Sequence, residues 1–142
     1  MPKSLLTNDG TYSFDISLIV ESENESMDDV IKILGFSEYK IIEKGKSFSK
    51  VLPCSEVNSY IYTQPCDESE KYQEVFFSFL KKIKEKRDEI DLLKTRYDIY
   101  LKVFYQSDYA QMQFKLLPEM FEVMCEIGLE CKFSIFSWGE VQ

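Results

Sequence analysis

The chain has 142 residues, the length of one domain, and its 44% hydrophobic and 15% aromatic content can supply a substantial core. Its formal net charge of −8 argues against binding to nucleic acid or to an anionic membrane, because both require clustered basic residues. No run approaches the roughly 18 apolar residues of a membrane-spanning helix, and no secretory signal opens the chain. We therefore expect a cytoplasmic protein.

The first predicted element is a strand, Tyr12–Val20, in which apolar and polar residues alternate, so that one face is buried and the other is wet. A helix follows, with Gly35 where a left-handed C-cap residue would stand. Ser26 and Asp29 resemble a capping box at its start. The apolar positions of this helix share helical spacing: Met27, Val30, Ile31 and Leu34.

The middle of the chain predicts two short strands, 39–43 and 59–64, separated by a loop. Pro65 is expected to end the second strand. The longest helix then begins, and its pattern leaves open whether it continues to about Lys94 or breaks near Arg87. Its apolar positions are Tyr72, Phe76, Phe79, Leu80 and Ile83, followed by Ile90 and Leu93.

The last third repeats the opening pattern. A strand over 97–106 and a short partner strand over 110–115 precede a helix from Pro118 to Ile127, which Gly128 ends. A final strand covers 129–136. The apolar positions expected on the helix are Leu117, Met120, Phe121 and Met124.

These elements predict one α+β domain over residues 1–142, in the order β-α-β-β-α-β-β-α-β. The sheet is expected to be mostly antiparallel, with the helices on one face. Each of the two strand–helix–strand units can supply a right-handed parallel crossover.

The sequence also resembles an uncharacterised bacterial family, "domain of unknown function 4279", over roughly residues 11–137. The resemblance is carried by Leu34-Gly35-Phe36, by the later Lys44-Gly45 turn, by the central helix and by the final helix–Gly128–strand arrangement. A proline that often follows the first motif in the family is replaced here by Ser37-Glu38. The resemblance implies the fold and no activity.

The residue types exclude most common catalytic sites. The chain has no histidine, no phosphate-binding glycine loop and no closely spaced cysteine pair, so we expect no cofactor and no enzyme activity. Cys125 and Cys131 are expected to act as small core residues. Whether Cys54 and Cys66 pair is left open.

Two acidic groups stand out. Three readings are weighed for the first group: a solvated surface, a Ca²⁺ site, or a contact surface for a basic protein. The second group lies on the polar face of the last helix. It is interpreted either as a solvated surface or as a contact surface for a basic protein. The residues predicted to contact a partner are Glu21, Glu23, Glu25, Asp28 and Asp29 in the first group, and Glu119, Glu122 and Glu126 in the second.

Tyr100 and Phe104 fall on the second face of their strand, where they would form an aromatic patch unless another segment covers them. Together with the acidic charge and the missing catalytic residues, this favours a non-catalytic protein-binding domain. The most concrete hypothesis is an immunity protein that neutralises a basic toxin, for example a nuclease. The alternatives are a regulatory or structural interaction module and a carboxylate-based metal enzyme.

Overall fold

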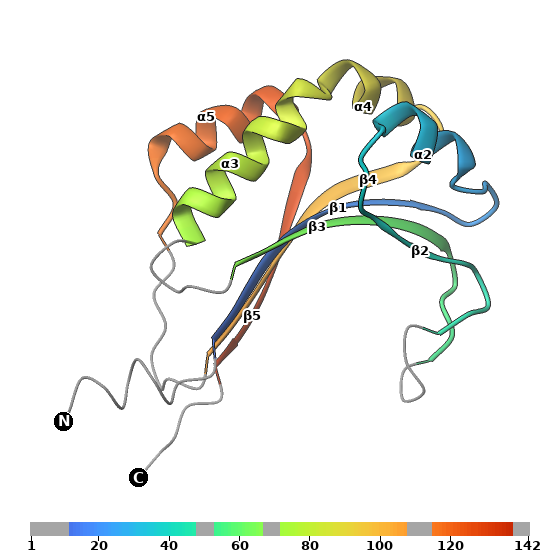
Figure 1. Cartoon of the computed structure of the whole chain (residues 1–142), viewed down its shortest axis with the longest axis horizontal. Helices are drawn as coiled ribbons and strands as arrows, with labels where there is room; N and C mark the ends of the chain where they lie inside the picture. Colours follow the sequence, from blue (N-terminus) through green and yellow to red (C-terminus); the bar gives the residue numbers. More distant parts are fainter. Residues whose placement is uncertain (1–11, 48–52, 67–71, 108–114, 138–142) are drawn as a thin grey trace, which may run out of the picture.

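A computed structural model describes residues 12–47, 53–66, 72–107 and 115–137. Within them the chain forms one sheet and a layer of helices (Figure 1). The elements, in chain order, are β1 (Tyr12–Ser22), α2 (Asp28–Leu34), β2 (Lys40–Ile42), β3 (Asn58–Cys66), α3 (Tyr72–Glu85), α4 (Arg87–Leu93), β4 (Asp98–Ser107), α5 (Pro118–Ile127) and β5 (Glu130–Ser137).

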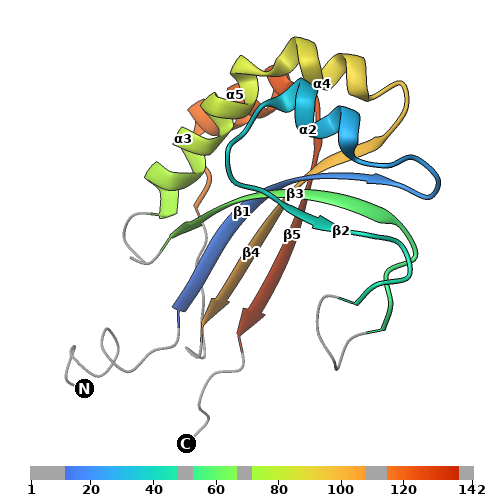
Figure 2. The same ribbon diagram turned by 45° about the vertical axis from the view of Figure 1, so that its right-hand side comes forward.

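The sheet has the strand order β2-β3-β1-β4-β5. All neighbours are antiparallel except β4 and β5, which are parallel and are joined through α5. β3 lies between β1 and β2, so the first strand–helix–strand unit is split by an inserted strand. The predicted class, a mostly antiparallel sheet with its helices on one side, is confirmed (Figure 2).

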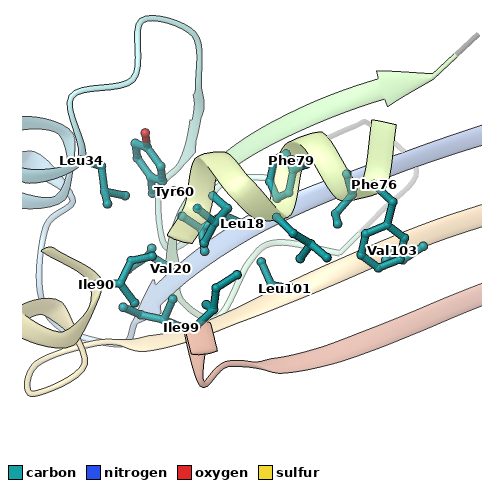
Figure 3. Close-up of a cluster of buried hydrophobic side chains, with 14 of the residues drawn as sticks. Leu18, Val20, Leu34, Tyr60, Phe76, Phe79, Ile90, Ile99, Leu101 and Val103 are labelled. Carbon is teal, nitrogen blue, oxygen red and sulfur yellow. The ribbon is translucent and has the colours of Figure 1, made fainter. Parts of the chain in front are cut away.

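The core lies between the sheet and the helices. The even-numbered residues of β1, from Phe14 to Val20, are buried beneath α3 and α4, as the alternation predicts. The prediction that the other face is wet is wrong for Ser17 and Ile19, which are buried between β3 and β4. Figure 3 shows Leu18 and Val20 of β1 together with buried side chains of β4 and of the helices. The labelled members of this cluster are Leu18, Val20, Leu34, Tyr60, Phe76, Phe79, Ile90, Ile99, Leu101 and Val103.

Glycine ends both helices that it was predicted to end. Gly35 and Gly128 have φ values of 69° and 72°, the left-handed region in which a side chain is strained. The predicted capping box at the start of α2 is wrong. Met27 occupies the N-cap position with its side chain in the core, and the Ser26 hydroxyl instead accepts a 3.5 Å hydrogen bond from the Asp28 amide.

The long central helix is two helices. The chain leaves helical geometry at Lys86, where φ is −101° and ψ is 17°, and its amide bonds the Ile83 carbonyl in a tighter turn. The break allows Ile83 at the end of α3 and Ile90 in α4 both to be fully buried over the curved sheet. It falls one residue before Arg87.

Pro65 does not end β3, which continues to Cys66. Proline is tolerated there because β2 pairs only as far as Ile61, so this part of β3 has no described neighbour on that side. The short strand predicted over 110–115 lies almost wholly outside the described residues.

Candidate interaction surface

Part of the first acidic group is tied to a base. The Arg96 guanidinium bonds the Asp29 carboxylate at 3.0 Å and the Glu25 carboxylate at 3.1 Å. Arg96 lies between α4 and β4, whereas Glu25 and Asp29 lie at the start of α2. The two ion pairs therefore link the β1–α2 connection to the α4–β4 connection. The hydrogen bonds that Arg96 donates to Asp29 and Glu25 raise the pKa of Arg96. These two acids are therefore partly neutralised.

The other members of the first group have different surroundings. Glu21 accepts a 3.2 Å hydrogen bond from the Tyr100 hydroxyl, whereas Glu23 and Asp28 are exposed. Burial, with Glu21 as a second cause, raises the pKa of Tyr100 to about 12. Among the described residues, no cluster of three or more acidic, cysteine or histidine side chains is arranged to hold a metal ion.

The second acidic group lies along α5. Glu126 forms an ion pair with Lys84 of α3, while Glu119 and Glu122 are exposed. α5 packs on α3 and α2 packs on α4, so the two acidic groups lie toward opposite ends of the helix layer (Figure 1). They do not form the common surface that side-by-side packing of the two units would have given.

Exposed apolar side chains gather at one edge of the molecule. Eight large hydrophobic residues are exposed in the described part of the chain, and five of them lie in β5, in α5 or at the N-cap of α5. We call these five the α5–β5 edge. They are Leu117, Phe121, Phe133, Ile135 and Phe136.

The position of this edge follows from the geometry of α5. The buried residues of the helix are Met120, Val123 and Ile127, which anchor it against α3 and the core. Leu117 and Phe121 lie one turn apart on another side of the helix, away from the side on which Glu126 meets α3. The predicted apolar stripe was therefore only half right, because Phe121 is 51% exposed.

β5 supplies the rest of the edge. Phe133 and Ile135 point to the helix side of the sheet, but the helices leave them 39% and 51% exposed. Phe136 points to the opposite side, where its ring lies 5.7 Å from that of Phe104. The strand thus presents apolar side chains on both of its faces. Surfaces of this kind are enriched at sites of protein contact.

The open face of the sheet carries no described helix (Figure 2). Tyr100 and Phe104 lie on it, as predicted, but both are half-buried. The Lys132 ammonium group lies 3.9 Å from the centre of the Tyr100 ring, and Ser17 bonds Thr63 at 2.8 Å beside Ile19. The open face is therefore covered by polar and aromatic side chains that contact one another.

Asp15 is half-buried on this face, between Pro65 of β3 and Phe104 of β4. Burial raises the pKa of its carboxyl above the ordinary value of 3.8, although the charges of Lys102 and Lys40 act in the opposite direction. An acid whose pKa is raised by folding stabilises the protein below its ordinary pKa and loses that contribution as the pH rises. At neutral pH the ionised Asp15 is therefore destabilising.

We expect Asp15→Asn to unfold at a higher temperature than the wild type near neutral pH, and the difference to shrink as the pH falls through the raised pKa of Asp15 toward 3.8. Thermal unfolding followed by circular dichroism over a pH series measures this. Asp98→Asn, at an exposed position on the same face, is the matched control and should change the pH dependence less. An Asp15→Asn advantage that grows toward acid pH would contradict the assignment.

The prediction that Cys125 and Cys131 are small core residues is half right, because Cys131 packs against the core and Cys125 does not. All four cysteines are free, so Cys54 and Cys66 do not pair. Cys125 is exposed on α5, which makes its predicted core role wrong. Cys131 is half-buried, and burial raises the pKa of its thiol to about 11.

Three comparisons place the chain among known proteins. A family model described as "Domain of unknown function (DUF4279)" matches residues 11–138, nearly the whole chain. No curated protein and no solved structure matches it. In the described part of the chain, no helix is both long and apolar enough to span a membrane.

Proposed function

The chain belongs to the DUF4279 family, for which no activity is described, and we propose that it is a non-catalytic domain that binds another protein. The observation that carries the proposal is the exposed apolar surface on the α5 part of the α5–β5 edge, formed by Leu117 and Phe121. Phe121 is its natural anchor, since an exposed aromatic ring on a well-packed helix presents a large contact area with little entropy to lose.

The charge of α5 and of the whole chain favours a basic partner. Glu119 and Glu122 are exposed on the side of α5 that also carries Glu126, next to the side that presents Phe121, and the whole chain carries a net charge of −8. Exposed carboxylates at one border of an apolar contact accelerate association with a positively charged surface and discriminate against acidic ones. A partner with an apolar pocket that has lysine or arginine along one side fits this arrangement.

We further propose that the partner is a basic toxin domain and that the chain is its immunity protein. The small size, the acidic charge and the lack of histidine support a domain that acts by occluding another protein. The exposed acids near α2, Glu23 and Asp28, are available for a second contact. Glu25 and Asp29 are less suited, because Arg96 already binds them.

Coexpression with the product of a neighbouring gene that encodes a toxin-like domain tests this proposal. We expect a complex that Phe121→Ala weakens at least about tenfold, as expected for a contact anchor. Replacing Glu119 and Glu122 with Gln should slow association and reduce its dependence on salt. Calorimetry and surface plasmon resonance provide the two measurements.

Leu92→Ala is the matched control for Phe121→Ala, since Leu92 is a 60% exposed apolar residue on α4, away from the α5–β5 edge. It should leave affinity unchanged. If the complex forms but is insensitive to Phe121 and to both glutamates, the proposed surface is wrong. If no toxin-like neighbour binds and another protein does, the domain is a regulatory or structural interaction module instead.

A further inference from the structure

β5 is an edge strand with unusual features. It has eight residues, contains no proline and pairs only with β4 among the described strands. Edge strands in soluble monomers are commonly short or protected by outward charges, because their unpaired amide and carbonyl groups are a template for another strand. The strand at the other edge, β2, has only three residues. The two edges are thus protected unequally.

The charges of β5 do not protect it. Its one lysine, Lys132, lies with its ammonium group 3.9 Å from the centre of the Tyr100 ring, over the open face rather than along the outer edge. The same group is 3.7 Å from the Glu130 carboxylate, so the strand is locally neutral. A strand with these features can approach another neutral strand without the repulsion expected from a chain of net charge −8.

We propose that β5 pairs antiparallel with β5 of a second copy of this chain, so that two five-stranded sheets join into one. A two-fold axis perpendicular to the sheet keeps both helix layers on the same side, and residues opposite each other then share a face. An axis at Ser134 sets Ile135 of each copy opposite Phe133 of the other. The exposed helix-side surfaces of the strand then cover each other.

The other registers fit less well. An axis at Lys132 would set the two lysines opposite each other, which is unfavourable for like charges in neighbouring strands. If the register shifted by one residue, each helix-side residue of one strand would lie opposite an open-face residue of the other. With the axis at Ser134, the two lysines are kept apart, because Lys132 lies opposite Phe136 of the second copy.

The sequence of β5 explains why a second copy, rather than a foreign strand, is the occupant. Phe133 and Ile135 flank Ser134 on the helix side, so the pattern is complementary to itself about that residue. A basic partner would gain nothing from this strand, since its charges already cancel. The proposed partner contact on α5, by contrast, includes exposed carboxylates.

Sedimentation velocity of the full chain, from low micromolar to millimolar concentration, tests the pairing. We expect a species of twice the 16.8 kDa chain mass. Ile135→Lys should raise the dissociation constant of the dimer at least about 100-fold, because formation of the dimer would then bury a lysine of each copy at the centre of the contact. Leu92→Lys, a matched change at the exposed surface of α4, should leave the dimer unchanged.

Disulfide trapping tests the register. In a Cys54→Ser, Cys125→Ser background, Ser134→Cys should form a covalent dimer on oxidation, because directly opposite residues have Cα atoms about 5 Å apart. Lys132→Cys should not, since its two copies would be roughly 14 Å apart. A wild type that is monomeric throughout, a dimer that Ile135→Lys leaves intact, or equal trapping at both positions would overturn the proposal.

Discussion

Replacing Phe79 with alanine should lower the free energy of unfolding by about 3–5 kcal/mol, the usual cost of removing a fully buried aromatic ring. Phe79 is 0% exposed in α3 and stacks on Tyr62 of β3, with ring centres 5.6 Å apart. Tyr62 in turn stacks on Phe36 at 3.9 Å, with the rings only 3° from parallel. The substitution therefore removes the end of a three-ring stack that joins α3, β3 and the segment after α2.

Urea unfolding followed by circular dichroism measures the loss, and an unchanged denaturant dependence would show that the folded state keeps its compactness. Phe77→Ala is the matched control, because it removes the same ring from the same helix at a half-buried position. It should cost less than half as much. If Phe77→Ala and Phe79→Ala lowered the free energy of unfolding equally, the three-ring stack would contribute no more to stability than a half-buried ring.

The fold could be predicted largely because its signals are local. The alternation in β1 identifies the residues of the core face, although it does not show that Ser17 and Ile19 on the other face are buried too. Gly35 and Gly128 end their helices because the left-handed conformation is intrinsic to glycine. The break at Lys86 could not be placed by the same reasoning. No proline or glycine marks it, and what accompanies it is the full burial of Ile83 before the break and Ile90 after it, which depends on the packing of both helices on the sheet.

The candidate surface was harder to predict, because it depends on what covers each residue. Phe121 has the spacing of a core residue, and only the packing of α5 against α3 shows that it lies outside. Arg96 was missed for a related reason. It is 71 residues from Glu25 and 67 from Asp29 in sequence, so no local pattern links them. The ordering of the strands, which leaves β5 at an edge, is likewise a property of the whole chain.

The attachment of α5 leads to the second large effect. Met120 is 1% exposed, and its sulfur accepts a hydrogen bond from the Leu117 amide at 3.4 Å, so one side chain both anchors the helix and satisfies an amide at its start. Met120→Ala should lower the free energy of unfolding by about 2–5 kcal/mol. The loss should be concentrated in α5, because this helix packs chiefly on α3 at the margin of the helix layer.

Hydrogen exchange separates this local effect from a general one. In Met120→Ala the amides of α5 should exchange faster than those of β1, whose central position in the sheet keeps them protected. Phe121→Ala is the informative comparison, since its ring is half exposed and its loss should change stability by less than about 1 kcal/mol while still weakening a partner. If Met120→Ala instead accelerates exchange equally in β1 and α5, then α5 is an integral part of the cooperative core. Its exposed face would then be presented by the whole domain as a rigid surface, which would favour a partner that fits it without rearrangement.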